Sequence, residues 1–391
     1  MYPTLTLAPG RQKRLSTGHP WVYATEIASV DPRIEPGSIV DVVDFRGRFI
    51  GRGYYNPRSQ IAVRLLTRKD ETIDREFFRQ KLLYCLKHRQ KVMPEATSYR
   101  LVFGEADFLP GLIIDKFEDY LVMQVLTLGM EKQKQLLTEL LVELLQPRAI
   151  YERNDVNVRE LEGLAQVKGV LYGEFQPEVI IKENGLSFLV DMENGQKTGY
   201  FLDQKENRAA IAPYVKDRIV LDCFCHTGSF TVHAAHYGAR SVLALDISEH
   251  AIATARRNAS LNGLENSCSF QVGNAFDVLR EMDREKRRFD VIILDPPAFT
   301  KSKQTLEGAV RGYKEINLRA MKLLPPSGIL ITCSCSYHMQ EDLFLEVIES
   351  AALDVGRQVR LLELRRQSKD HPILLAAKET YYLKFLILEI L

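Results

Sequence analysis

Hydrophobic and polar positions follow three different patterns along the chain. In residues 1–72, short runs with a period of two, such as residues 38–44 and 48–55, are separated by turn signals such as Asn56-Pro57. A period of two places alternate side chains on opposite faces, which is typical of strands. Several short strands between turns predict a small β-barrel, and we expect it to form the first domain.

The next segment, residues 73–190, mixes helical and strand-like spacing. Apolar residues recur at helical spacing over residues 73–93, just before Pro94, and again over residues 131–145, just before Pro147. Proline ends helices because it lacks the backbone N–H and clashes with the preceding turn. Strand-like apolar runs lie between the two helical stretches. We therefore expect a linking α+β domain here.

From residue 191 to residue 391, apolar runs alternate with segments of helical periodicity. One such helix should begin at Ser248, a typical N-cap, and end near Gly263. Alternating strands and helices predict a parallel, doubly wound, Rossmann-like sheet with helices on both faces. The strand-like runs are residues 218–224, 241–247, 268–274, 289–295 and 328–334.

Composition excludes several classes of protein. The 391 residues are 46% hydrophobic and 26% charged, a balance typical of globular chains rather than of disordered or coiled-coil ones. No apolar run reaches the roughly 18 residues of a membrane helix, and the N-terminus lacks the order of a secretory signal. Six cysteines are too few for a disulfide framework. We expect a cytoplasmic protein without a membrane partner.

The net charge of +1 conceals an asymmetry. Residues 1–69 contain 11 Lys and Arg against 5 Asp and Glu, whereas the rest of the chain contains 41 against 46. A basic module on a nearly neutral protein indicates an anionic partner that binds that module. A solvated surface is the alternative interpretation.

Candidate chemistry lies after the strands, because ligands of a doubly wound sheet bind beyond the carboxyl ends of its strands. The turn after the first strand, residues 222–230, has Gly228 as its single glycine and lacks G-x-G-x-x-G and G-K-[ST]. A cofactor without phosphates therefore fits better than a dinucleotide. Asp246, at the end of the second strand, is placed to accept hydrogen bonds from two ribose hydroxyls, and Asn274 and its neighbours, after the third, are placed to contact an adenine.

Two further motifs contain residue types that could carry chemistry. After the fourth strand comes Asp295-Pro296-Pro297, whose prolines make the loop rigid; we interpret it as functional, although it could be a strand terminator. The cysteines of Cys223-x-Cys225 lack the usual spacing of zinc ligands, and we expect no metal.

Together these pieces resemble a class I S-adenosylmethionine (SAM)-dependent methyltransferase. The order is D-x-F-x-x-T-G-x-F after the first strand, A-L-D at the second and D-P-P after the fourth. Nearly the whole chain is also similar to the ribosomal RNA large-subunit methyltransferase I family, whose members methylate cytosine at carbon 5. The segments that carry this likeness are residues 19–23, 194–204, 332–336, 342–344, 370–372 and 382–384.

The resemblance implies a PUA-type RNA-binding barrel, the linking domain and a SAM-dependent catalytic domain. It implies large-subunit ribosomal RNA, free or in a ribosome assembly intermediate, as the partner, and a homodimer is compatible with the sequence. The implied SAM-binding residues are Gln196, Lys197, Thr198, Gly199, Phe201, Asp203, Asp222, Phe224, Thr227, Gly228, Asp246, Ser248, Asn274, Ala275, Phe276 and Asp295. The implied substrate-binding residues are Pro296, Pro297 and Cys335, with Cys335 and Asp295 catalytic.

Methylation at carbon 5 requires a cysteine, because the carbon becomes nucleophilic only after a thiolate adds to carbon 6. Cys333 and Cys335 compete for this role and should share one side of a strand. We favour Cys335, which lies nearer the carboxyl end and matches the family's spacing. Asp295 can hold the edge of the base.

Two departures and two alternatives remain. Ala298 occupies the place where many RNA cytosine-5 methyltransferases, though not this family, carry a second cysteine, and Asn274 stands where aspartate is commoner. The same fold could instead methylate a nitrogen of guanosine or of another base. An RNA-binding assembly factor without activity is disfavoured, because the cofactor residues are intact.

Overall fold

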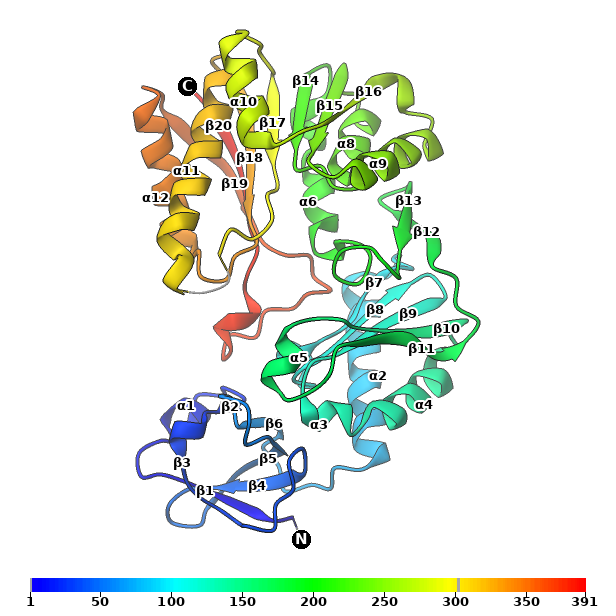
Figure 1. The fold of residues 1–391 in the computed structure, drawn as a ribbon, viewed down its shortest axis with the longest axis vertical. Coiled ribbons are helices and arrows are strands. Elements are labelled where there is room, and N and C mark those ends of the chain that lie inside the picture. The colour runs from blue at the N-terminus through cyan, green and yellow to red at the C-terminus, as the bar shows by residue number, and fades with distance from the viewer. Residues whose placement is uncertain (1, 301–302) are drawn as a thin grey trace. The chain divides into compact units, whose positions relative to one another are not determined.

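The computed structural model describes residues 2–300 and 303–391, and the chain divides into two compact units (Figure 1). The first unit comprises Met1–Ile181, Val190–Asp203 and Lys369–Thr380. The second comprises Lys182–Leu189, Gln204–Ser368 and Tyr381–Leu391. No helix among the described residues is long and apolar enough to span a membrane.

The N-terminal part of the first unit is a six-stranded sheet with the order β2-β6-β5-β4-β1-β3. The strands predicted over residues 38–44 and 48–55 are confirmed as β4 and β5, and Val40 and Val42 of β4 point into an apolar core. A short helix, α1 (Lys13–Ser16), follows β1. The strands are β1 (Thr4–Leu7), β2 (Trp21–Val22), β3 (Ile27–Val30), β4 (Ile39–Val43), β5 (Phe49–Tyr55) and β6 (Val63–Thr67).

The rest of this unit is built on a five-stranded sheet with the order β11-β10-β9-β8-β7. The helix predicted over residues 73–93 is confirmed as α2 (Arg75–Val92), and the Asp74 carboxylate caps it by accepting from the Phe77 N–H at 3.0 Å. The strands are β7 (Tyr99–Phe103), β8 (Leu112–Phe117), β9 (Tyr120–Val125), β10 (Ala149–Asn154) and β11 (Val167–Gly173). A further helix is α5 (Val158–Leu161).

The helix predicted over residues 131–145 is confirmed as α4 (Lys134–Leu145), which begins three residues later than predicted. A separate short helix, α3 (Leu128–Glu131), precedes it. In α3, Gly129 packs against the ring of Tyr54 so tightly that an added Cβ would lie 2.0 Å from the ring. The short helix α3 thus packs against β5, whereas α4 buries Leu137, Leu140 and Leu141.

Tyr54 joins the two sheets of the first unit. Its side chain belongs to the same apolar core as Phe78 of α2, and its hydroxyl donates to the Pro110 carbonyl at 2.7 Å and lies 2.9 Å from the Thr127 hydroxyl. The Asn56 amide donates to the Glu162 carboxylate at 2.8 Å. Residues from both sheets therefore share one buried core.

The second unit contains a seven-stranded sheet with the order β16-β15-β14-β17-β18-β20-β19. Its first five strands are parallel, as predicted, and β20, which lies outside the predicted strands, is antiparallel to both β18 and β19. The strands are β14 (Ile219–Cys223), β15 (Ser241–Asp246), β16 (Cys268–Val272), β17 (Val291–Leu294), β18 (Gly328–Ser334), β19 (Val359–Arg365) and β20 (Lys384–Ile390).

Helices cover both faces of this sheet, as the alternating pattern predicts. Apolar residues of α10, α11 and α12 pack on one face, and those of α8 pack on the other (Figure 1). The helices are α6 (Lys205–Ala210), α7 (Ala212–Val215), α8 (Ser229–His236), α9 (Glu249–Leu261), α10 (Ala275–Arg284), α11 (Leu306–Leu323) and α12 (Glu341–Asp354). A separate two-stranded sheet is formed by β12 (Glu178–Glu183) and β13 (Leu186–Asp191).

Candidate active site

The turn that follows β14 carries the first group of predicted cofactor residues. Phe224 and Gly228 both have positive φ values, 62° and 77°, and Gly228 approaches α9 so closely that an added Cβ would lie 2.8 Å from the Ala255 Cβ. This tight turn leaves Asp222 buried at the end of the strand, with its Oδ2 accepting from the Thr231 hydroxyl at 2.6 Å.

Two buried polar atoms at this turn fit a polar ligand. Within residues 2–300 and 303–391, the Asp222 Oδ1 and the Thr227 hydroxyl oxygen have no hydrogen-bond partner. A buried carboxylate oxygen without a partner is costly, and a cationic or N–H group of a ligand would satisfy it. Burial, with the charges of Asp295 and Asp246 nearby, raises the pKa of Asp222 to about 7.

This raised pKa leads to a prediction about pH. A ligand cation beside Asp222 requires the ionised carboxylate, which is lost as pH falls through the pKa. SAM binding to the free protein should therefore weaken by roughly five-fold between pH 7 and pH 6. Calorimetry at pH 7 and at pH 6 measures this change. The Asp222→Asn variant should bind SAM more weakly at both pH values, but its affinity should differ much less between them. An equally steep loss in the variant would exclude Asp222 as the titrating group.

Asp246 ends β15 with its carboxylate already oriented. Its Oδ2 accepts from the His226 N–H and its Oδ1 from the Ser248 N–H, both at 2.9 Å. The prediction that Ser248 caps the next helix is confirmed, because its hydroxyl accepts from the Ala251 N–H at 3.2 Å. Two fixed N–H donors leave the other lone pairs of the carboxylate available to a ribose.

Asn274 has a structural role that the sequence did not indicate. Its Oδ1, expected to accept from an adenine amino group, accepts from the Phe276 N–H at 2.9 Å and caps α10, whose first residue is Ala275. The Phe276 ring lies 5.9 Å from the Phe299 ring, which follows the Asp-Pro-Pro motif. Contact of residues 274–276 with adenine stays a prediction.

Asp295 is held by a residue that sequence analysis left out of the site. The Gln204 amide donates to both carboxylate oxygens of Asp295 at 3.1 Å, and its own carbonyl accepts from the Asn207 amide at 2.7 Å. Cys333 is fully buried beside them, and burial, with the Asp295 charge, raises the pKa of its thiol well above the usual value. Cys333 is therefore kept in the unreactive thiol form.

Cys333 lies within β18, whereas Cys335 lies one residue beyond its end, so the expectation that both belong to the strand holds for Cys333 only. On either side of Cys335, the Ser334 and Ser336 hydroxyls lie 3.1 and 3.3 Å from the buried Tyr313 hydroxyl. The Cys335 thiol is partly exposed and lies 3.9 Å from the Pro296 carbonyl oxygen. The structure thus brings Cys335 to the Asp-Pro-Pro loop.

Lys384 is a second residue that sequence analysis left unassigned. Its buried ammonium donates to the Ser336 carbonyl at 2.7 Å and to the Tyr382 carbonyl at 2.8 Å, and so fixes the backbone directly after Cys335. Burial lowers the pKa of Lys384 to about 8, against the opposing effect of the Cys335 charge. A charged side chain at the start of the apolar strand β20 was the available signal.

The remaining predicted cofactor residues belong to the first compact unit. Within it, the Lys197 ammonium bonds to the Asp203 carboxylate at 3.1 Å and lies 4.4 Å from the centre of the Phe201 ring. The Thr198 hydroxyl donates to the Asp115 carboxylate at 2.5 Å, and the Gly199 N–H to the Gln196 carbonyl at 2.9 Å. These bonds order the segment, whose contact with SAM stays a prediction.

Two protein-family models match this chain, one near its N-terminus and one over its catalytic part. A model for a PUA-like domain matches residues 5–68, and one for an S-adenosylmethionine-dependent methyltransferase matches residues 166–369. A ribosomal RNA large subunit methyltransferase I of Shewanella denitrificans is 46% identical over 389 residues, 98% of either chain. The protein of that name from Tolumonas auensis is 45% identical over 393 residues, 99% of either chain.

Solved structures share the fold along almost the whole chain. A methyltransferase crystallised with S-adenosylhomocysteine superposes with a TM-score of 0.86 at 21% identity, over 99% of this chain and 100% of that one. A SAM-dependent methyltransferase from Streptococcus mutans gives 0.85 at the same identity and coverage. Since the matches to the curated relatives are full-length, this chain, a SAM-dependent methyltransferase, belongs to the ribosomal RNA large subunit methyltransferase I family.

Proposed function

We propose that the enzyme transfers a methyl group from SAM to carbon 5 of a cytidine in large-subunit ribosomal RNA through a covalent adduct with Cys335. The observation that carries this proposal is the difference between the two cysteines. The Cys335 thiol is partly exposed against the Asp-Pro-Pro loop, whereas Cys333 is buried beside Asp295. A nitrogen methyltransferase has no need of an accessible thiol at this position.

The chemistry then follows from the placement of the side chains. The Cys335 thiolate adds to carbon 6 of the cytosine, while Asp295, oriented by Gln204, holds the base edge and stabilises a proton on the ring nitrogen. The resulting enamine makes carbon 5 nucleophilic. Asp222 and Asp246 would hold bound SAM, whose sulfonium would give its methyl group to carbon 5 as an electrophile and leave as S-adenosylhomocysteine. Loss of the carbon 5 proton and expulsion of the thiolate restore the aromatic ring.

The Lys384 ammonium supports the thiolate in two ways. It is a positive charge near Cys335, and such a charge favours the ionised form of a thiol. It also fixes the Ser336 carbonyl, which limits the movement of the neighbouring Cys335. Lys384 is thus a positioning residue in this proposal.

The PUA-like domain provides a basic surface for the RNA backbone. Arg11, Lys13 and Arg14 line a cavity of about 380 Å³ around α1, with Arg14 paired to Glu26 at 2.8 Å. Two of these three cations have no ion pair among the described residues, and phosphates are the anions that RNA offers. We propose that this surface contacts ribosomal RNA, free or in a ribosome assembly intermediate, in the cytoplasm.

Product analysis tests the proposal. The full-length protein, SAM and large-subunit ribosomal RNA from cells lacking this gene should yield 5-methylcytidine when the RNA is digested and its nucleosides are separated by mass spectrometry. Control reactions omit either SAM or the enzyme. Methylation confined to a guanosine nitrogen would overturn the assignment to carbon 5 while leaving the SAM-dependent methyltransferase intact.

A further inference from the structure

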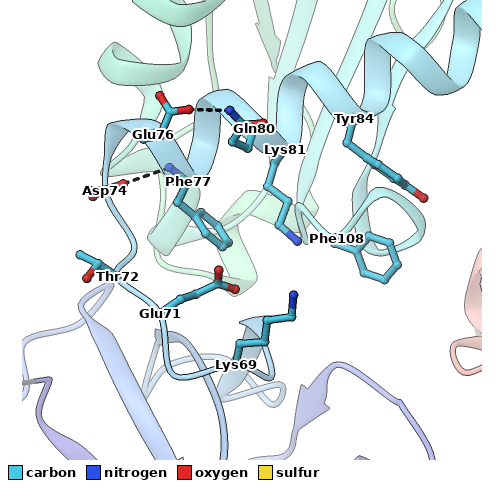
Figure 2. A pocket seen from close by; sticks show the side chains of 10 residues that line it. All are labelled: Lys69, Glu71, Thr72, Asp74, Glu76, Phe77, Gln80, Lys81, Tyr84 and Phe108. Atoms are coloured by element: carbon cyan, nitrogen blue, oxygen red, sulfur yellow. Dashed lines mark hydrogen bonds between the residues drawn. The ribbon is translucent and has the colours of Figure 1, made fainter.

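A second cavity lies outside the catalytic unit, on α2 and the connection that leads into it. Its volume is about 570 Å³, and its walls come from the stretch after β6, the first three turns of α2 and Phe108 (Figure 2). All of these residues belong to the first compact unit. None is used by the chemistry described above.

Two aromatic rings at this cavity are unusually exposed. Tyr84 is 54% exposed and Phe108 is 41% exposed, and their ring centres lie 6.3 Å apart. Water-exposed aromatic rings that meet at a cavity provide a flat apolar surface without an internal partner. Such a surface suits a planar, apolar ligand face.

The backbone holds Phe108 in this position. Its φ of 58° lies in the left-handed region, which is uncommon for a bulky residue. The preceding Asp107 is buried and accepts two hydrogen bonds of 2.6 Å from the Arg89 guanidinium, and the Phe108 N–H donates to the Glu105 carbonyl at 3.2 Å. The exposed ring is therefore presented by a rigid turn rather than by a loose loop.

Two lysines supply positive charge beside the rings. The Lys81 ammonium lies 5.1 Å from the centre of the Phe108 ring, and Figure 2 shows it and Lys69 pointing into the same space. Neither ammonium has an ion-pair partner in the described part of the chain. Burial lowers the pKa of Lys81, so that this cation would gain from a bound anion.

The acidic side chains at the cavity already have partners. The Glu71 carboxylate accepts from the Thr67 hydroxyl, the Asp74 carboxylate caps α2, and Glu76 accepts from the Gln80 amide at 2.5 Å. Asp74 and Glu76 lie at the end of the cavity away from Phe108 (Figure 2). The aromatic end therefore combines exposed rings with two ammonium groups, and the negative charge of Glu71 acts on Lys81.

We propose that this cavity, defined by Lys69, Lys81, Tyr84 and Phe108, binds an unpaired nucleotide of the RNA substrate. An aromatic platform stacks with any base, and ammonium groups beside it neutralise the flanking phosphates. The rings and lysines of this cavity have that chemistry. The proposal rests on RNA as the substrate of the proposed function, but not on the position that is methylated.

Binding of the full-length protein to a single-stranded 12-nucleotide RNA containing one 2-aminopurine tests this site. Phe108→Ala should weaken binding by roughly 5- to 100-fold with little change in its salt dependence, because stacking is not electrostatic. Phe108→Gly should do the same without a risk to folding, since glycine accommodates the positive φ. Phe108→Trp should retain binding. The fluorescence of 2-aminopurine, quenched by stacking, reports the contact directly.

The lysines should respond differently. The double variant Lys69→Gln, Lys81→Gln should weaken binding and reduce the slope of log affinity against log salt by about 1, as expected for losing one or two phosphate contacts on a single strand. Matched controls are Tyr172→Ala on β11, 41% exposed like Phe108, and Lys87→Gln on the same helix as Lys81. Both should bind RNA as the unmodified protein does.

The outcomes separate this proposal from its alternatives. Unchanged RNA affinity in both Phe108 variants and in the double lysine variant would overturn it. If the same variants bound RNA normally but methylated ribosomal particles poorly, the cavity would instead be assigned to a protein partner. If the variants lose RNA binding but the unmodified enzyme makes no 5-methylcytidine, the carbon 5 assignment fails and the nucleotide site stands.

Discussion

Replacing Cys335 by alanine should abolish methyl transfer and leave the affinity for SAM unchanged. The proposed thiolate acts on carbon 6 of the base, so its loss removes the only route that makes carbon 5 nucleophilic. Cys333→Ala is the matched control, because Cys333 is buried and held as a thiol by its surroundings. That variant should keep measurable turnover and lose about 1 kcal/mol of unfolding free energy through a small cavity.

A substrate RNA that carries 5-fluorocytosine at the target position sharpens this test. Fluorine cannot leave as a proton does, so the thioether at carbon 6 should persist and appear as a shifted band on a denaturing gel. The adduct should form with the unmodified enzyme and with Cys333→Ala, but not with Cys335→Ala. Adduct formation by the unmodified enzyme and by Cys335→Ala, but not by Cys333→Ala, would assign the nucleophile to Cys333.

Asp246→Ala should weaken SAM binding by about 10- to 100-fold. A hydrogen bond from a ribose hydroxyl to a charged carboxylate contributes about 1.5–3 kcal/mol to the free energy of binding. Two backbone N–H groups hold the Asp246 carboxylate in place for such bonds. Calorimetry measures the change. Asp277→Ala, an exposed carboxylate on α10, is the control and should bind SAM normally. Equal affinities in the two folded variants would exclude Asp246 from the cofactor site.

Local signals allowed the elements to be predicted where periodicity and caps agree. Asp74 and Ser248 cap the helices that the apolar spacing indicates, and the five parallel strands follow from their unbroken apolar runs. The direction of β20 could not be predicted in this way, because an apolar strand has the same composition whether it runs parallel or antiparallel to its neighbour. The start of α4 was predicted three residues early, because apolar spacing does not mark the exact end of a helix.

In the candidate site, the residues placed by the order of the strands could be predicted from the sequence, whereas those held by distant contacts could not. Residues that follow strands, such as Asp246 and Asp295, are brought to one edge by the topology of the sheet. Gln204 and Lys384 act through bonds to groups far along the chain, and no spacing in the sequence reveals such bonds. The sequence does not reveal the capping role of Asn274, because an amide at the end of a strand fits either an adenine or a helix cap.

The Tyr54 side chain restricts how this protein could be divided or recombined. A β-barrel that met its neighbour only at a polar surface could be moved between proteins as an independent module. Here, removing the first 72 residues would take Tyr54 out of a core that it completes and leave Gly129 facing an empty space. The PUA-like domain and the linking region should therefore melt in one cooperative transition, and evolution would have to exchange them together.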